Sequence, residues 1–407
     1  MLEGIARIPP SPPCKRRNVG YMFSNEAREA ADKLPVNQMR STFVHSLVMA
    51  YGLPKAMKII RPHQATREEL CTAHSEELVG ELLASSDLDI GCLTLISDCP
   101  VFPGLSSYVQ LVAGGTLAAA RAIVEGQVDI AIHWDGGRCV SVITRASGFC
   151  YVNDIVLSIL ELQKKYRRIL YLDIDIHHGD GVEAAFLFSP RVFTCSFHKY
   201  DQGFYPGTGS PMVRGSGKGL HHTLNVPLKS GLRGPLFLQV FQRIVDGIMD
   251  AYTPDCIVLQ CGADGAHLNL NAAEEAGHGQ RNDRGMGWNL DPGTFGDAVA
   301  YLRDLPSRDG TSSSPQPAIP LLILGGGGYV NTITARCWAK ATAAAIGDVN
   351  LVNDVIPEHA LWPEYGRDPE LGCRLDENEV DGSIGGVLEG ALASLERLRE
   401  AKSGLRR

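Results

Sequence analysis

The sequence lacks the features that mark several common classes of protein. Its 407 residues contain no uninterrupted apolar run of the roughly 18 residues that a membrane-spanning helix needs. The first residues, MLEGIARIPPSPPCKRR, contain no apolar core of a secretory signal. Lys and Arg number 38 against 46 Asp and Glu, a net charge of −8, whereas phosphate-binding domains are basic. We therefore expect an intracellular, soluble protein with no direct nucleic-acid or membrane partner.

Three familiar site motifs are also missing. No two of the 11 Cys are spaced C-x-x-C, which excludes a zinc ribbon and a thioredoxin-type site, and we expect the thiols to be reduced. No G-x-S-x-G occurs, so the nucleophile elbow of the serine hydrolases is excluded. The G-S-G-K at 215–218 resembles part of a phosphate loop, but Gly219 stands where Ser or Thr is needed.

Strand-length apolar segments alternate with helix-length segments from about residue 128 onward. This alternation predicts an α/β fold with a parallel sheet covered by helices on both faces. Because no repeat and no change of composition interrupts it, we predict one domain over 19–390. The predicted strands are 128–134, 168–176, 191–197, 256–261 and 319–324, and the clearest helices are 152–165, 236–251 and 332–345.

Four segments differ from this regular pattern. Residues 1–18 are Pro-rich and then basic, and they predict a disordered tail, with nuclear import through the basic residues as a second interpretation. Residues 265–287 and 304–318 are rich in Gly, Asn, Ser or Pro and predict mobile loops. Residues 391–407 predict a charged, solvated helix or tail. Outside these segments, T-x-x-E at 66–69 predicts a helix start.

Polar residues follow the predicted strands at their carboxyl ends, where ligands bind in open parallel sheets. Asp173, Asp175 and His177 recur with the strand period of two and therefore share one face. Asp264 follows a neighbouring strand and is a candidate third ligand. Two carboxylates and one imidazole suit a catalytic divalent metal, zinc or iron(II). The alternative, a buried ion-pair cluster, is disfavoured because the nearest arginines, at 167–168, lie at the other end of the strand.

Several motifs together resemble the zinc-dependent histone deacetylases, class I-like. They are A-S-G-F-C-Y-V-N-D at 146–154, D-I-D-I-H-H-G-D-G at 173–181, F-Y-P-G-T-G at 204–209, G-A-D at 262–264 and G-G-G-G-Y at 325–329. The resemblance covers roughly residues 19–365, and R-S-T-F-V-H-S-L at 40–47 is similar to the type-eight-like branch and its fungal relatives. It implies the arginase/deacetylase α/β fold, with a mostly parallel sheet flanked by helices.

The resemblance also implies roles for individual residues. Asp175, His177 and Asp264 match the zinc ligands, and Tyr329 matches the phenol that stabilises the developing oxyanion. The residues that match the substrate-binding site are Asp98 at the rim, Gly148, Phe149 and Tyr205 in the acetyl-lysine channel, and Arg40 near the acetate-exit tunnel. The residues that match a structural potassium site are Asp173, the Ser196 hydroxyl, and backbone groups of Asp175, His177 and Phe197.

One departure bears directly on activity. The family places a His-His pair, the general base and acid, shortly after a W-x-G-G segment. Here residues 132–141 read IHWDGGRCVS, so Cys139 and Val140 occupy those positions. Valine cannot transfer a proton, while a thiol has an ordinary pKa of about 8.5 and could instead bind zinc. The carboxylates that hold the two histidines in the family match Asp173 and Asp180, and here both lose those partners.

Three explanations of this departure compete. The protein could be a pseudoenzyme that keeps zinc and binds acetyl-lysine or a complex partner. His178 could act as a substitute base, although its position in the family is structural. Residues 139–144 could also reflect a local reading-frame or splice error, because the replaced segment is confined, length-neutral and apolar. Two histidine codons in a shifted genomic frame would identify that error.

The resemblance implies a function and a cellular setting. We expect one Zn²⁺ per chain, structural K⁺, and hydrolysis of acetyl-lysine on histone tails or other proteins. Transcriptional repression, corepressor partners and a nuclear location are implied as well, with the cytoplasm as the second compartment. The alternative is a catalytically impaired, zinc-binding scaffold or acetyl-lysine binder. A third hypothesis, deacetylation of a small acetylated amine, is disfavoured by the match at Asp98.

Overall fold

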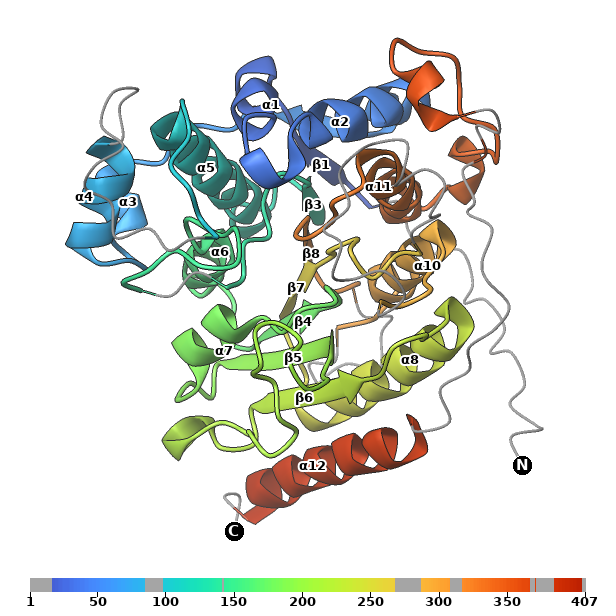
Figure 1. The fold of residues 1–407 in the computed structure, drawn as a ribbon. Coiled ribbons are helices and arrows are strands. Elements are labelled where there is room, and N and C mark those ends of the chain that lie inside the picture. The colour runs from blue at the N-terminus through green and yellow to red at the C-terminus, as the bar shows by residue number, and fades with distance from the viewer. Residues whose placement is uncertain are drawn as a thin grey trace.

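A computed structural model describes residues 17–84, 98–140, 143–267, 287–307, 317–366, 370 and 384–404. In these ranges the chain forms one eight-stranded sheet of order β2-β1-β3-β8-β7-β4-β5-β6, with every neighbouring pair parallel (Figure 1). The predicted α/β fold is confirmed. Most of the predicted N-terminal tail and of the two predicted loops lies outside the described residues, as do residues 141 and 142.

All five predicted strands are present, and four of them begin and end within two residues of the predicted positions, whereas the fifth ends three residues early. The strand predicted over 168–176 ends at Asp173, because side-chain carboxylates then take the place of the sheet ladder. The backbone N–H of Asp175 donates to Asp173 Oδ1 at 3.1 Å, and that of His177 donates to Asp175 Oδ1 at 2.9 Å. The five strands are β3 Ile130–His133, β4 Ile169–Asp173, β5 Val192–Lys199, β7 Cys256–Gln260 and β8 Leu321–Leu324.

Three further strands were not predicted. β1 (Val19–Met22) and β2 (Lys58–Ile60) are only four and three residues long, and two of the three β2 residues are exposed. β6 (Thr223–Leu228) contains Pro227, which cannot donate to a ladder and is tolerated because β6 is an edge strand. The apolar pattern of these three strands is therefore weak, which is why the sequence does not predict them.

Two layers of helices enclose the sheet (Figure 1). Each layer forms a hydrophobic core with the sheet face that it covers. One layer contains α2 Arg40–Ala50, α8 Gly234–Ala251, α10 Pro292–Arg303 and α11 Asn331–Ile346. The other contains α5 Leu105–Val124, α6 Asp154–Leu162 and α7 Asp180–Phe186. Three further helices, α1 Asn25–Ala31, α3 Arg67–Leu70 and α4 Glu76–Ala84, lie outside these layers.

The predicted helix start at Thr66 is confirmed, since both hydrogen bonds of a capping box join Thr66 and Glu69.

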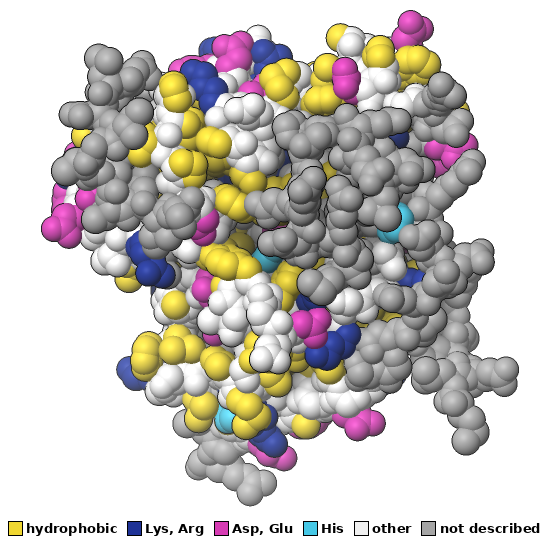
Figure 2. Space-filling view, in the orientation of Figure 1, with side chains coloured by type: hydrophobic (Ala, Val, Ile, Leu, Met, Phe, Trp, Pro, Cys, Tyr) yellow, Lys and Arg dark blue, Asp and Glu magenta, His cyan; other side chains and the backbone are white. Residues whose placement is uncertain are grey.

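Among the described helices, α5 alone is long and apolar enough to cross a membrane by length and composition. However, 72% of its apolar stretch is buried inside the protein, where it packs on α6 and β3. Basic, acidic and hydrophobic side chains are interspersed on the face shown in Figure 2.

The two ends of the described chain are held more firmly than the sequence predicts. Arg17 belongs to the predicted tail, yet it is buried and donates to the backbone carbonyls of Arg303 at 2.7 Å and Ile319 at 2.6 Å. Helix α12 (Ile384–Gly404) packs on α8 and β6, so the predicted boundary at residue 390 falls inside a helix. Its predicted solvation is wrong along one face, because Ala391, Leu395 and Leu398 are buried at i, i+4 and i+7.

We expect Leu395→Ala to lower the free energy of unfolding by about 2–5 kcal/mol, as for other buried leucines. Leu395 packs so tightly on α8 that a Cβ added to Gly247 would lie 2.7 Å from its Cδ1. Urea denaturation followed by circular dichroism measures the change. Glu396→Ala, at the exposed neighbouring position, is the control and should alter stability by less than about 0.5 kcal/mol. Equal effects of the two substitutions would show that α12 does not pack as described.

Candidate metal centre and pocket

Three acidic and imidazole side chains converge beyond the carboxyl ends of the adjacent strands β4 and β7. Asp175 and His177 follow β4, and Asp264 follows β7. One potential ligand atom from each lies within 4.8 Å of the other two. His177 Nδ1 is 3.1 Å from Asp175 Oδ1 and 3.0 Å from Asp264 Oδ2. This donor set suits a divalent cation such as zinc or iron(II).

Backbone and amide donors fix the orientation of both carboxylates. Asp175 Oδ2 accepts from Gln260 Nε2 at 2.9 Å and from the backbone N–H of Gly327 at 2.8 Å. The backbone N–H of Ile176 donates to Asp264 Oδ1 at 3.0 Å. Gln260 was not predicted as a site residue. Its only signal in the sequence is a polar residue at the end of the apolar run CIVLQC.

The charges of these groups depend strongly on one another. Burial disfavours the charged imidazole, but hydrogen bonds to Asp175 and Asp264 raise the pKa of His177 to about 10. Burial opposes ionisation of Asp175 too, yet its bond with His177 keeps the pKa of Asp175 below the ordinary value. Burial and the Asp175 charge raise the pKa of Asp264 to about 6. The two buried carboxylates therefore favour a positive charge beside them, which is what a bound cation supplies.

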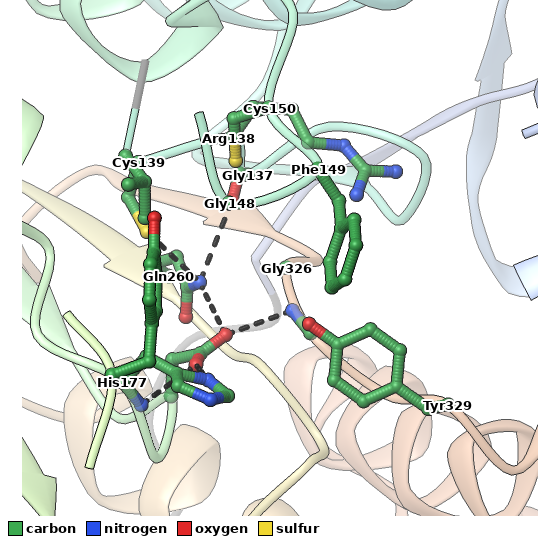
Figure 3. Close-up of a pocket in the computed structure, with 14 residues that line it drawn as sticks. Gly137, Arg138, Cys139, Gly148, Phe149, Cys150, His177, Gln260, Gly326 and Tyr329 are labelled. Carbon is green, nitrogen blue, oxygen red and sulfur yellow. Dashed lines mark hydrogen bonds and ion pairs between the residues drawn. The ribbon is translucent and has the colours of Figure 1, made fainter. Parts of the chain in front are cut away.

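A small pocket of about 50 Å³ opens beside these groups (Figure 3). The rings of Phe149 and Tyr329 meet edge to face, with centroids 6.0 Å apart. The Tyr205 hydroxyl lies 2.9 Å from Ser147 Oγ on the exposed side. The lining residues are Gly137, Arg138, Cys139, Val140, Gly148, Phe149, Cys150, Asp175, His177, Tyr205, Gln260, Gly326, Gly327 and Tyr329. A wider depression of about 630 Å³ lies at the amino ends of β4 and β5, lined by Arg167, Arg168, Pro190 and Arg191, and shares none of these groups.

One aromatic residue of this site was not predicted. Phe204 stacks on the His177 ring, with a centroid distance of 5.2 Å and an interplanar angle of 7°. The ring of Tyr205 meets His177 edge-on at 6.0 Å. The two consecutive aromatic residues in F-Y-P-G were the only signal, and the sequence does not indicate which of them packs on the imidazole. Phe204 thus restrains the candidate ligand, while Tyr205 forms the wall.

The predicted rim and inner residues take distinct positions. Asp98 Oδ2 accepts from the backbone N–H of Gly148 at 2.8 Å, and Asp98 Oδ1 is buried with no partner in the described part of the chain. Gly148 has φ +59°, and a Cβ there would lie 2.8 Å from the Tyr205 hydroxyl, so glycine fits this position best. Arg40 lies behind the pocket, where it donates to the carbonyl of Gly326 at 2.8 Å.

Cys139 and Val140, at the positions predicted to correspond to the histidine pair, both lie in the pocket wall. Both side chains are buried, and Cys139 Sγ accepts from Gln260 Nε2 at 3.8 Å. Burial and then the charge of Asp173 raise the pKa of the Cys139 thiol well above its ordinary value. Val140 packs close to Gly148. Neither position therefore supplies a group that exchanges protons near neutral pH.

The two carboxylates that lack the histidine partners have different surroundings. Asp173 gains substitutes, because Tyr171 Oη donates to its Oδ2 at 2.5 Å and the backbone N–H of Asp175 donates to its Oδ1. Asp173 therefore keeps hydrogen-bond partners in the absence of the histidine, one of them Tyr171, which precedes it by one strand period. Asp180 begins α7, and its Oδ1 is buried with no partner among the described residues. Burial raises the pKa of Asp180 to about 6, although the nearby His178 lowers it.

His178 forms hydrogen bonds with groups outside the pocket and does not line it. Its Nδ1 lies 2.8 Å from Thr208 Oγ1, and its Nε2 lies 3.1 Å from Glu183 Oε2. Both ring nitrogens therefore have partners within the scaffold. This arrangement disfavours the hypothesis that His178 replaces the missing base.

The groups of the predicted potassium site lie at the paired ends of β4 and β5. The strand register places Asp173 opposite Ser196, and Phe197 is fully buried beside them. The Ser196 hydroxyl lies 3.0 Å from His198 Nδ1. The potassium site itself stays a prediction.

We expect Asp180→Asn to stabilise the protein at pH 7 by up to about 3 kcal/mol, at 1.36 kcal/mol per pKa unit. The folded-state pKa of Asp180, about 6, exceeds its ordinary value of 3.8. The native state therefore binds more protons than the unfolded state between about pH 4 and 6, and stability falls as the pH rises through this window. Urea denaturation at pH 7 and pH 4 measures the effect.

The difference between Asp180→Asn and the parent protein should be much smaller near pH 4, where the carboxyl is protonated in the folded state and about half protonated in the unfolded state. Asp354→Asn, at a side chain that is 90% exposed, is the control. A gain in stability that is equal at both pH values would rule out the titration of Asp180 as its cause.

Comparison with known proteins identifies the family. A protein-family model described as histone deacetylase domain matches residues 34–345. The chain is 36% identical to histone deacetylase 8 of Danio rerio over 375 residues, which cover 90% of this chain and 92% of that protein. It is 37% identical to histone deacetylase 8 of Xenopus tropicalis over 373 residues, which cover 88% and 93% respectively. The chain belongs to the histone deacetylase family of amide hydrolases, and the predicted family and arginase/deacetylase fold are confirmed.

Proposed function

We propose that the protein binds one zinc ion through Asp175, His177 and Asp264, admits an acetylated lysine side chain to the adjoining pocket, and hydrolyses its amide slowly. The observation that carries this proposal is the composition of the pocket lining. Ligand-type groups, aromatic walls and a phenol are all present. The described lining residues include no imidazole other than His177, which the proposal assigns to the metal.

The remaining residues have roles that their positions support. A bound zinc ion would supply Lewis acidity toward the amide carbonyl and toward water. The Tyr329 phenol can donate a hydrogen bond to the carbonyl oxygen as negative charge develops there. Phe149 and Tyr205 present apolar ring surfaces to the alkyl stem of the lysine, and Asp98 holds the backbone of Gly148 between them at the rim.

Proton transfer is the missing part of the machinery. Burial raises the pKa of the Cys150 thiol to about 11 and that of the Tyr205 phenol to about 12. The pKa values of Cys139 and Tyr329 are raised still further above their ordinary values, also chiefly by burial. None of these groups is poised to take a proton from water near pH 7. Because a positioned acid or base contributes about 10²–10⁴-fold, we propose slow turnover.

The test combines metal analysis, binding and turnover on the purified full-length chain. We expect one equivalent of zinc, micromolar binding of a fluorescent acetyl-lysine peptide, and hydrolysis at least about 100-fold below that of a family member with the histidine pair. Tyr329→Phe should abolish any residual hydrolysis while leaving the zinc content unchanged. Normal turnover would contradict the need for the pair, and absence of zinc would contradict the metal assignment.

A second candidate function is non-catalytic recognition of acetyl-lysine. The rim carboxylate and the aromatic walls favour it, because they are needed for binding but not for proton transfer. Peptide binding with no turnover, even over days, would favour this candidate. The rest of the proposal relies on family membership: acetylated histone tails or other proteins as substrates, structural K⁺, corepressor partners, transcriptional repression, and a nuclear location with the cytoplasm as second compartment.

A further inference from the structure

Three arginines gather at the edge of the sheet opposite the candidate metal centre. Arg167 and Arg168 immediately precede β4, and Arg191 immediately precedes β5, its parallel neighbour (Figure 1). Together with Pro190 they line the depression of about 630 Å³ at the amino ends of these strands. Seven residues along the chain lead from Arg168 to Asp175. At about 3.3 Å per residue, the depression therefore lies roughly 20 Å from the candidate metal centre.

One of the three charges is neutralised within the protein. Arg168 Nη2 lies 2.5 Å from Asp255 Oδ1, and Arg168 Nε donates to the backbone carbonyl of Thr253 at 2.5 Å. Asp255 Oδ2 accepts from the backbone N–H groups of Arg167 at 3.2 Å and Arg168 at 3.0 Å. Both oxygens of Asp255 are therefore occupied, and the Arg168 guanidinium is fixed at the wall of the depression.

The other two guanidinium groups keep an uncompensated charge. Arg191 Nη2 donates to the backbone carbonyls of Gln163 at 2.8 Å and Tyr166 at 3.2 Å, which hold the group in place without neutralising it. Arg167 is exposed, and within the described ranges its guanidinium forms no hydrogen bond or ion pair. The depression thus presents two positive charges in excess of its one carboxylate.

The neighbouring charged groups do not supply the missing negative charge. Glu161 Oε2, near the end of α6, lies 2.7 Å from Lys164 Nζ and 3.6 Å from Arg121 Nε, so it already faces two cations. Lys165 adds a further positive charge, and its Nζ donates to the backbone carbonyl of Val124. The region is therefore basic on a chain whose net charge is −8, and it favours an anionic ligand.

The wall of the depression is firmly held. Pro190 restricts the backbone, and its carbonyl accepts from the Tyr252 hydroxyl at 3.4 Å. The backbone N–H of Ile169 donates to the carbonyl of Arg191 at 2.9 Å, which joins the two arginine segments. Burial raises the pKa of Tyr252 above its ordinary value, whereas the charges of Arg168 and Arg191 lower it, so both charges act on one hydroxyl. The cations are thus positioned before any ligand binds.

We propose that Arg167, Arg168 and Arg191 bind the phosphate group of a small phosphate monoester. Such a group carries a charge of about −1.5 to −2 at pH 7, which matches the two uncompensated guanidinium charges. Guanidinium groups present their donors in a planar fork that fits phosphate oxygens. The volume lies within the range of about 300–1,000 Å³ for small-molecule sites, which leaves room for the esterified part. The site requires neither zinc nor turnover, so it stands apart from the proposed function.

A nucleic-acid backbone fits these observations less well. Such a backbone is bound along a basic patch or stripe of a basic domain, whereas these arginines share one depression and the chain as a whole is acidic. A short DNA duplex that binds more tightly than a sugar phosphate would therefore overturn the proposal.

The test is isothermal titration of the full-length protein, at constant ionic strength, with glucose 6-phosphate, glucose 6-sulfate and inorganic phosphate. We expect saturable binding of glucose 6-phosphate. The singly charged sulfate ester should bind about two- to fivefold more weakly, which is the usual contribution of one exposed charge pair. Inorganic phosphate should also bind more weakly, because it lacks the esterified part. Equal affinities for inorganic phosphate and the sugar phosphate would assign the site to the free ion and overturn the choice of an ester.

Arg167→Met tests the site without disturbing the fold, because the Arg167 guanidinium has no partner among the described residues. We expect its affinity for glucose 6-phosphate to fall by at least about tenfold, through loss of charge-assisted hydrogen bonds. Arg191→Met should weaken binding similarly and also unfold at a lower temperature, since two bonds to backbone carbonyls are lost. Phosphate bound at the distant metal centre would be unaffected by either substitution.

Arg61→Met is the matched control. Arg61 is exposed and follows β2, an edge strand, at the carboxyl end. This variant removes the same charge and should bind glucose 6-phosphate as tightly as the parent protein does. An unchanged affinity in Arg167→Met, an equal loss in Arg61→Met, or equal binding of the phosphate and sulfate esters would overturn the proposal.

Discussion

Replacing Cys139 and Val140 together with histidine is expected to raise the rate of acetyl-lysine hydrolysis by about 10²–10⁴-fold, the usual contribution of positioned acid–base groups. Both positions line the pocket beside the candidate metal ligands. Asp173 and Asp180 both contribute to the raised pKa of the Cys139 thiol, so an imidazole there would have carboxyl groups nearby. Values of kcat/KM on a fluorogenic acetyl-lysine peptide, at equal zinc content, measure the gain.

Each single histidine substitution should recover only part of this rate, because one group cannot serve efficiently as both base and acid. Cys139→Asn with Val140→Leu is the matched control, since it enlarges both side chains without adding a titratable group. Thermal unfolding shows whether the larger side chains are accommodated beside Gly148, which already lies close to Val140. If the double histidine variant folds, binds zinc and hydrolyses no faster, the assignment of these two positions is wrong.

Removal of one of the three candidate metal ligands, Asp175, His177 and Asp264, is expected to have the second largest effect. Asp264→Ala should reduce zinc affinity by more than about 100-fold, because loss of an outer-shell partner alone typically costs 10–100-fold. Gln260→Leu should reduce zinc affinity by only about 10–100-fold. It removes one of the two donors to Asp175 Oδ2 and leaves the Gly327 N–H in place. Competition with a chromophoric chelator measures both affinities.

Asp98→Asn is the control for the zinc measurements. Asp98 lies at the rim, where it accepts a hydrogen bond from Gly148 and does not contact the candidate ligands. Its zinc affinity should equal that of the parent protein. If Asp264→Ala retains tight, stoichiometric zinc while Asp98→Asn loses it, the metal lies elsewhere in the pocket. If Gln260→Leu has no effect, the amide does not position Asp175.

The central strands could be predicted from the sequence because their apolar runs are long and their carboxyl ends carry polar residues. β4 and β7 are completely buried, and both show this pattern clearly. The edge strand β6 contains a proline, and β1 and β2 gain their pairing from tertiary contacts rather than from sequence pattern. The predicted solvation of the C-terminal helix is wrong because Ala391, Leu395 and Leu398 form an apolar stripe among its charged residues.

The candidate ligands could be predicted because spacing alone places Asp175 and His177 together. The residues that support them could not be predicted in the same way. Gln260 contacts Asp175 from a strand that is distant in sequence, and Phe204 covers His177 from a loop. Tyr171 is different, because its separation of two residues from Asp173 on one strand was a usable signal.

The position of α12 has a consequence for the behaviour of the protein in solution. β6 is an edge strand, and an open edge presents unpaired backbone groups that can add a strand from another molecule. Helix α12 packs along β6 and so shields that edge (Figure 1). A chain shortened to residue 390 would lose most of this cover, and we expect it to self-associate with rising concentration in sedimentation experiments. We therefore expect α12 to protect this edge of the sheet against aggregation.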